Sequence, residues 1–289
     1  MADQAEKLRE LVGYNEDQLN SSRKTRIIAV ASGKGGVGKS NIAINIALGF
    51  AKLGKSVVVL DADLGLANVN VILGVIPRYN LYHMMRQQKT MREIITDTNY
   101  GIQIVAGASG FSKIANLTEE ERRSFILELS SLGQADILVI DTSAGVSNNV
   151  LDFVAAADDA IVVTTPEPTA ITDAYGIIKI IATEINNPRL SLKLLVNRVA
   201  SVTEAKKVSD RVINIASQFL NIKVDYLGYI YEDLHVQQAV LRQKPFLVTD
   251  PHCKASLCIM NVVGRLEKVD FKEGSGIMNF IMKLFGRMS

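Results

Sequence analysis

Residues 27–40, which read IIAVASGKGGVGKS, limit the folds open to this chain more than any other stretch. The stretch begins with branched apolar residues typical of a buried strand, and a helical pattern continues from Ile42 to Phe50. Strand, G-x-x-x-x-G-K-S and helix in this order make a phosphate-binding loop, because glycine lets backbone N–H groups converge on phosphate oxygens. The sequence therefore predicts a nucleotide site after the first strand.

The loop contains the expected phosphate and metal contacts. We expect the phosphates to be surrounded by Gly33, Lys34, Gly35, Gly36, Val37, Gly38, Lys39 and Ser40. Lys39 would place its charge on the terminal phosphates, and Ser40 would offer a hydroxyl to Mg²⁺. Lys34 is a second lysine that the minimal motif does not need, and its side chain is predicted to point away from the floor of its own loop.

The rest of the 289-residue chain predicts a doubly wound, mostly parallel α/β sheet. Short apolar runs alternate with helical patterns, as in parallel strands covered on both faces. Further strands are expected at 56–61, 102–105, 137–141, 160–164, 192–197 and 224–230. Helices are expected at 41–53, 119–131, 146–156, 169–184, 203–220 and 234–242. With no repeat and no second boundary, residues 23–270 form one predicted nucleotide-binding domain.

Three aspartates follow predicted strands, where a parallel sheet binds its ligand. Asp141 ends the apolar run 137–140 and is expected to hold the Mg²⁺ shell. Asp61 and Asp63 end the run 57–60, so one carboxylate can face the metal and the other the water that attacks the γ-phosphate. A single aspartate here could merely cap the next helix, but three in this order make that interpretation weak.

The nucleotide base is predicted to be adenine. A guanine-selective site needs Asn-Lys-x-Asp after a strand, with the aspartate accepting from the guanine N1 and N2 donors. Here Asn197 ends the strand and the chain continues Arg198-Val199-Ala200, without that aspartate. ATP with Mg²⁺ is therefore favoured.

Composition restricts the remaining classes. A formal net charge of +2 gives no global indication of nucleic acid binding. The chain begins without the apolar segment of a signal peptide, and no run approaches ~18 apolar residues, so neither export nor a membrane span is expected. The only cysteines, Cys253 and Cys258, exclude a disulfide framework and fit a reducing cytoplasmic setting. His252 beside Cys253 makes a poor metal site without C-x-x-C spacing.

Both ends of the chain differ from the central domain. Residues 1–22 combine a short amphipathic pattern with a polar stretch, which predicts a tethered arm or, alternatively, a solvated tail. Residues 271–289 contain a predicted linker and an amphipathic segment at 277–288 with basic residues on its polar side. Such a helix is typical of an interfacial membrane anchor, but a terminal helix docked on the protein's own core would give the same pattern.

The loop K-G-G-V-G-K-S at 34–40 resembles the deviant phosphate loop of the MinD/ParA family of dimerising ATPases. Further motifs resemble its flagellar branch, known as FlhG, FleN or YlxH. These motifs are D-x-D-L-G-L-A-N-V-N at 61–70, T-P-E-P-T-A-I-T-D-A-Y at 165–175, L-V-N-R-V at 195–199 and D-Q-A-x-x-L-R at 3–9. The resemblance covers essentially the whole chain. The sequence departs from it at Ser143, where proline or glycine is frequent, and at Tyr231, where proline usually precedes Glu-Asp.

This resemblance implies roles for single residues. Lys34 would act across the interface of an ATP-dependent homodimer, Lys39 would bind phosphate, and Asp63 would orient the attacking water. Ser40, Asp61 and Asp141 would form the metal site. Adenine would contact Asn197 and the loop residues Ile230, Glu232 and Asp233.

The resemblance also implies a function and partners. We expect an ATP-hydrolysing switch, cytoplasmic and reversibly bound to the inner face of the cell membrane, that regulates flagellar number or placement. Gln4 would act on the flagellar GTPase FlhF, segment 277–288 would bind anionic lipid, and basal-body components are further partners. The main alternative is a partition ATPase that binds DNA, which would need clustered surface Lys and Arg. An iron–sulfur carrier on the same fold would need paired cysteines, which the chain lacks.

Overall fold

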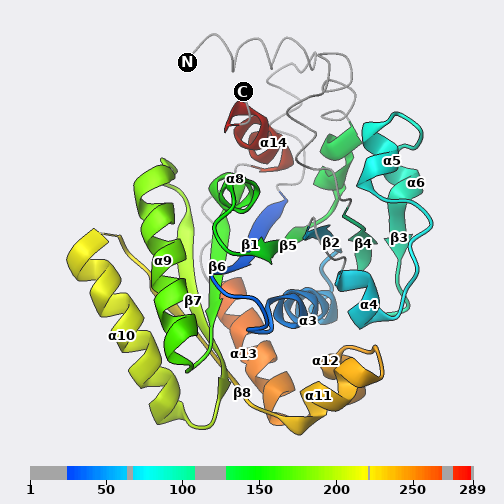
Figure 1. Cartoon of the computed structure of the whole chain (residues 1–289). Coiled ribbons are helices and arrows are strands. Elements are labelled where there is room, and N and C mark those ends of the chain that lie inside the picture. The colour runs from blue at the N-terminus through cyan, green and yellow to red at the C-terminus, as the bar shows by residue number, and fades with distance from the viewer. Residues whose placement is uncertain (1–24, 64–67, 108–127, 221, 269–275, 288–289) are drawn as a thin grey trace.

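An eight-stranded sheet runs through the centre of the computed structural model, with helices on both faces (Figure 1). The structure describes residues 25–63, 68–107, 128–220, 222–268 and 276–287. The strands lie in the order β3-β4-β2-β5-β1-β6-β7-β8, and every described pairing is parallel except that of β3 with β4. The predicted doubly wound, mostly parallel α/β fold is confirmed.

The strands form where branched apolar runs occur, and the central ones are buried along nearly their whole length because helices cover both sides. They are β1 (Arg26–Ser32), β2 (Val57–Ala62), β3 (Ile95–Asp97), β4 (Gln103–Val105), β5 (Ile137–Ala144), β6 (Asp159–Thr164), β7 (Ser191–Val199) and β8 (Asp225–Tyr231). The sequence analysis missed β3, a three-residue edge strand without a continuous apolar run.

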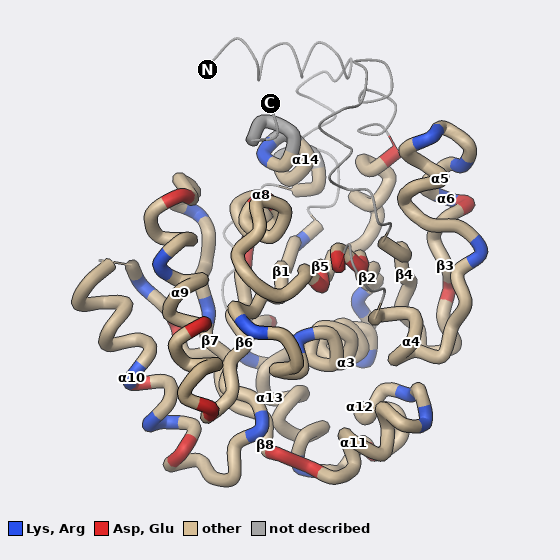
Figure 2. The backbone as a smooth tube through the Cα atoms, in the orientation of Figure 1, with Lys and Arg blue, Asp and Glu red and all other residues tan. Residues whose placement is uncertain are grey.

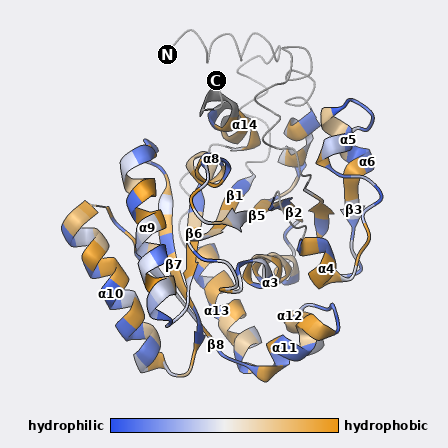
Figure 3. Cartoon of the chain, viewed as in Figure 1, coloured by the Kyte–Doolittle hydropathy of each residue, from blue (hydrophilic) through white to orange (hydrophobic). Residues whose placement is uncertain are grey.

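Two large apolar clusters lie one on each face of the sheet, and a small third one forms around Val196, Val199, Ala205 and Val208. Figure 3 shows hydrophobic residues both in the strands and on the helices around them. One face carries α5 (Leu81–Met85), α6 (Met91–Ile94), α8 (Asn148–Ala156), α9 (Pro168–Glu184), α10 (Val202–Leu220) and α14 (Gly276–Arg287). The other face carries α3 (Lys39–Lys52), α4 (Val69–Leu73), α11 (Leu234–Leu241), α12 (Phe246–Thr249) and α13 (Lys254–Lys268).

Some helices differ from the prediction. The sequence analysis did not identify α4, α5, α6, α12 or α13. The helix expected at 119–131 lies mostly outside the described residues, and a 3₁₀ turn, η2 (Ser131–Gln134), stands at its end. No helix in the described ranges is long and apolar enough to cross a membrane.

The carboxyl-terminal helix α14 is packed on the sheet rather than held apart from it. It contacts α8, β1 and η2, and its residues Ile277, Phe280, Ile281 and Leu284 are buried. The ring of Phe280 stacks on that of Phe153 in α8, with 6.5 Å between centroids. Of the two interpretations left open by the amphipathic pattern, docking on the core is thus the arrangement in this structure. The amino-terminal arm at 1–22 and the linker at 271–275 lie outside the described residues.

Candidate nucleotide site

The phosphate loop lies at the carboxyl end of β1, between its neighbours β5 and β6, where an open α/β sheet binds its ligand. Gly38 has φ +94°, and a Cβ there would lie 2.4 Å from Nδ2 of Asn197. At Gly33 a Cβ would lie 2.2 Å from the carbonyl oxygen of Asp173 in α9. These two glycines therefore serve the packing of the loop on β7 and α9, in addition to the backbone approach expected from the motif.

Lys39 and Asp141 form a buried ion pair below this loop. Lys39 Nζ donates to Asp141 Oδ1 at 2.8 Å, and the side chains are 7% and 0% exposed. Burial raises the pKa of Asp141, with Lys39 and Ser40 acting in the opposite direction. Its second oxygen, Oδ2, is buried without a hydrogen-bond partner among the described residues. A buried anionic oxygen of this kind suits a cation or a cation-bound water.

Asp61 lies beside Asp141, because β2 and β5 pair in parallel with these two residues in register. Its carboxylate accepts hydrogen bonds from the backbone N–H groups of Asp63 at 3.1 Å and Val69 at 3.3 Å. Burial, and then the negative charge of Asp141, raise the pKa of Asp61 to about 7. Figure 2 shows the acidic positions gathered at the ends of β5 and β2. Ser40, Asp61 and Asp141 therefore offer oxygen donors of the kind that Mg²⁺ prefers.

Asp63 stands where the described part of this loop ends. Its Oδ2 accepts a hydrogen bond from Asn68 Nδ2 at 3.3 Å. Residues 64–67, part of the D-x-D-L-G-L-A-N-V-N motif, lie outside the described residues. The structure thus brings Asp63 to the same edge of the sheet as the other two aspartates.

Lys34 contacts residues of its own chain that come far later in the sequence. Its Nζ donates to Glu167 Oε2 at 2.6 Å and to Thr169 Oγ1 at 2.9 Å, at the start of α9. Its side chain is 36% exposed and that of Glu167 54%. The hydrogen bond and charge of Lys34 lower the pKa of Glu167. Sequence reasoning noted the T-P-E-P-T motif but gave neither residue a role.

A pocket of about 520 Å³ opens beside Gly38. Its lining is Gly38, Asn41, Ile42, Asn197, Arg198, Ile230, Tyr231, Glu232, Asp233, Val236, Gln237, Val240, Leu241 and Phe246. The residues expected around adenine are therefore brought together, and Tyr231, a departure from the family pattern, lies in the same lining. Asn197 has an additional contact, because its Nδ2 donates to the carbonyl oxygen of Val37 at 2.8 Å.

The sequence analysis missed the contribution of α3 and α11 to this pocket. Asn41 lies in the first turn of α3, and Val236 and Gln237 belong to α11. A phosphate loop always places the start of its helix near the nucleotide, so Asn41 could have been named from position alone. No local signal links α11 to the loop, because that contact depends on the path of the chain after β8.

Comparison with known proteins gives consistent results. A family model described as "ParA: NUBPL iron-transfer P-loop NTPase" matches residues 23–267. The antiactivator FleN of Pseudomonas aeruginosa is 36% identical over 254 residues, which are 88% of this chain and 89% of FleN. The flagellum site-determining protein YlxH of Helicobacter pylori is 34% identical over 92% of this chain and 90% of YlxH.

A solved structure shares the fold. The septum site-determining protein MinD of Pyrococcus horikoshii, solved with Mg-ADP, superposes with a TM-score of 0.68 at 23% identity. The match covers 87% of this chain and 99% of that one. The likeness concerns the fold.

Proposed function

Because the chain belongs to the ParA family of P-loop NTPases and is an ATPase of this family, we propose that it is an ATP-dependent dimerising switch that regulates flagellar number or placement. The flagellar part rests on FleN and YlxH, which match about nine tenths of this chain and of their own lengths. The switch part rests on the nucleotide site described above.

The main support for an ATP-dependent switch is the position of Lys34. A second lysine directly after the first glycine of the loop is not among the buried groups that face the phosphates, since its partners are the partly exposed Glu167 and Thr169. Such a side chain can exchange these contacts for phosphate oxygens of a facing copy at little cost, because exposed ion pairs contribute only about 0–1 kcal/mol. Lys34 is therefore suited to respond to a second nucleotide.

Other residues of the chain bind the phosphates, the adenine base, the attacking water and the metal ion. Lys39 binds the terminal phosphates, and Asn197 with Ile230, Glu232 and Asp233 surrounds adenine. Asp63 holds the attacking water through its carboxylate. Ser40, Asp61 and Asp141 would hold Mg²⁺, which neutralises charge on the phosphate oxygens when it is bound.

Membrane binding by 277–288 is the second part of the proposal. In this structure α14 buries Phe280, Ile281 and Leu284 in the core, so the helix must leave its contacts with α8 and β1 before the same residues can enter lipid. One amphipathic helix binds lipid weakly, whereas two on a dimer raise the effective concentration of the second helix at the membrane. Dimerisation would thus favour reversible attachment to an anionic membrane surface.

The amino-terminal arm at 1–22 supplies the third part. We propose that Gln4 within this arm stimulates the flagellar GTPase FlhF. A peptide of residues 1–22 is expected to accelerate GTP hydrolysis by that GTPase, and the Gln4→Ala peptide is not. An inactive wild-type peptide would leave the arm as a solvated tail.

Iron–sulfur transfer, which the description of the family model mentions, has little support in this chain. Its only two cysteines are Cys253 and Cys258, and Cys258 lies on the buried face of α13, in the core. Cluster binding uses four thiolates, or two from each of two chains, at accessible positions.

The proposed switch is tested by its oligomeric state. The Asp63→Ala variant should bind ATP and sediment as a dimer, while the wild-type chain with ADP should sediment as a monomer. Hydrolysis should fall by roughly 10²–10⁴-fold in this variant, because a positioned acid–base group is lost. A monomer under both conditions would contradict dimerisation. Unchanged flagellar number after deletion of the gene in its host would contradict the flagellar role alone.

A further inference from the structure

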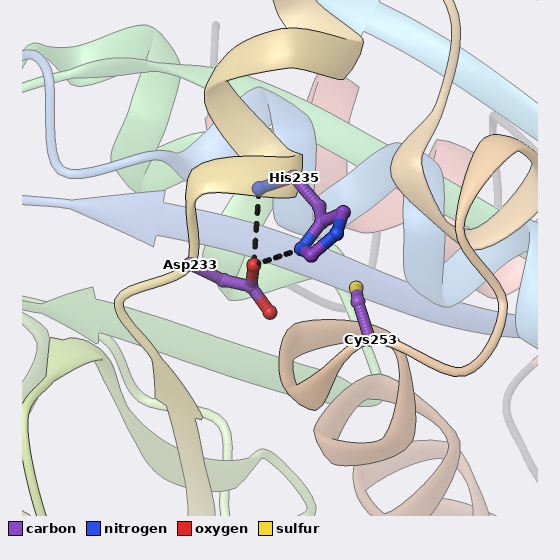
Figure 4. Close-up of side chains that lie close together, drawn as sticks. All are labelled: Asp233, His235 and Cys253. Atoms are coloured by element: carbon purple, nitrogen blue, oxygen red, sulfur yellow. Dashed lines mark hydrogen bonds and ion pairs between the residues drawn. The ribbon is translucent and has the colours of Figure 1, made fainter.

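A cluster of three potential metal ligands lies at the edge of the nucleotide pocket and takes no part in phosphate binding. Asp233 precedes α11, His235 lies in the first turn of that helix, and Cys253 directly precedes α13. Figure 4 shows the three side chains directed toward one another. One ligand atom from each residue lies within 4.8 Å of the others.

The donors of this cluster differ from those at the phosphate loop. A thiol, an imidazole and a carboxylate together match Zn²⁺, whereas Mg²⁺ takes oxygen ligands and rarely a thiolate. Ligand atoms around tetrahedral Zn²⁺ lie about 3.5 Å apart, given bonds of about 2.0–2.3 Å. The cluster therefore needs only a modest contraction. We propose that Asp233, His235 and Cys253 form a binding site for a divalent transition-metal ion such as Zn²⁺, with a water molecule as the fourth ligand.

The hydrogen bonds within the cluster support this assignment. His235 Nδ1 and Asp233 Oδ1 lie 2.7 Å apart, within hydrogen-bond distance, so the imidazole and the carboxylate are already held beside each other. Asp233 is held from outside the cluster as well, since its Oδ2 accepts from the backbone N–H of Ala255 at 3.2 Å. The carboxylate is thus fixed in place, as a ligand with its own supporting hydrogen bond should be.

His235 is the ligand most accessible to solvent, and its side chain can move to meet a metal ion. Its side chain is 51% exposed, and that of Asp233 is 9% exposed. Cys253 is half-buried, and its Sγ lies 3.3 Å from Ser256 Oγ and 3.4 Å from the Ser256 backbone nitrogen. An ion could reach the site from solvent on the side of the imidazole, while the other two ligands stay anchored to the starts of α11 and α13.

A metal ion bound at this site would link two parts of the fold. Asp233 also lines the base pocket, so a metal ion here would join the rim of that pocket to the start of α13. Binding to the folded chain alone stabilises it by mass action. We therefore expect Zn²⁺ to raise the thermal unfolding midpoint of the nucleotide-free protein.

The test uses the full chain, freed of metal and nucleotide, and titrated with Co²⁺ as a spectroscopic substitute for Zn²⁺. A sulfur-to-cobalt charge-transfer band should appear and saturate at one equivalent, and Zn²⁺ but not Mg²⁺ should displace it. Cys253→Ser should abolish the band. Serine is a favoured residue before a helix and can keep the contact with Ser256, so this variant is expected to fold.

The chain offers matched controls. Cys258→Ser removes the other cysteine and should leave the band intact, and His252→Gln should leave Zn²⁺ affinity unchanged. His235→Gln changes an exposed side chain and removes one of the three protein ligands. It should weaken Zn²⁺ binding roughly tenfold or more, because loss of even a group that only supports a ligand costs about that much. A wild-type protein without the band, a band that persists in Cys253→Ser, or a band lost in Cys258→Ser would overturn the proposal.

Discussion

Lys34 shows how a single residue can have one role in a lone chain and another in a pair. Its contacts with Glu167 and Thr169 join residues 133 and 135 positions away, yet they lie at the surface and are individually weak. The buried pair of Lys39 and Asp141 is different, because removing one partner leaves a charge in the core. The two lysines of the loop should therefore respond differently to substitution.

Lys34→Ala is expected to keep its thermal midpoint and to bind nucleotide within about fivefold of wild type, since an exposed ion pair contributes about 0–1 kcal/mol. It should fail to dimerise with ATP, as measured by sedimentation velocity. Lys39→Ala is the comparison, because it should lose nucleotide binding itself. A normal ATP-dependent dimer of Lys34→Ala would contradict the role given to this lysine.

Asp61 predicts a pH dependence of stability in the absence of Mg²⁺ and nucleotide. Its folded-state pKa of about 7 lies above the ordinary value of 3.8, so the folded chain binds the proton more tightly than the unfolded chain. The unfolding free energy should therefore fall as pH rises from about 4 to about 7, by an amount on the order of a few kcal/mol from this group.

The measurement is denaturant unfolding at pH 5 and pH 8 in EDTA, for the wild type and for Asp61→Asn. The amide cannot ionise, so the loss of stability between the two pH values should be smaller in the variant. Equal losses in both proteins would show that Asp61 does not titrate in this range.

At the scale of elements, the apolar side chains of α14 can be buried either in the protein core or in lipid. Fully burying Phe280, Ile281 and Leu284 stabilises the docked helix by roughly 5–9 kcal/mol before entropy is counted, at about 1.5–3 kcal/mol for each side chain. Lipid can take up the same side chains, so undocking at a membrane loses little of this term. Undocking into water loses all of it, and the helix should remain docked in a monomer away from lipid.

Leu284→Ala is expected to destabilise the protein by about 2–5 kcal/mol, as a leucine removed from a closed core. Leu257→Ala in α13 is the matched control, because that leucine is 52% exposed. Chemical unfolding gives both values. If Leu284→Ala were as mild as the control, α14 would not be part of the folded core in solution.

At the scale of the whole molecule, nucleotide state and membrane attachment should change together. The wild-type protein is expected to float with anionic vesicles in the presence of a non-hydrolysed ATP analogue and to stay below them with ADP. Removing residues 276–289 should abolish flotation with the analogue, and Lys34→Ala should do so while α14 is intact. Flotation of Lys34→Ala with the analogue would show that attachment does not need the dimer.

The sequence by itself determined the features that depend on neighbouring residues. Branched apolar runs identified seven of the eight strands, the glycine-rich loop located the phosphate site, and Asp61 and Asp141 follow their strands at the edge where the sheet binds its ligand. These inferences hold because the period of a strand, the spacing of a loop and the carboxyl end of a parallel strand are local properties.

Only the tertiary structure decided which distant segments meet. It placed Lys34 beside Glu167 and α11 along the base pocket. It also grouped His235 with Asp233 and Cys253, although His252 is the histidine next to Cys253 in the sequence. It also decided that α14 is docked, although its amphipathic pattern fits a groove and a membrane equally well. An apolar stripe indicates only that one face of a helix must be shielded from water. Which surface shields it depends on the strand order and on the helices packed beside it.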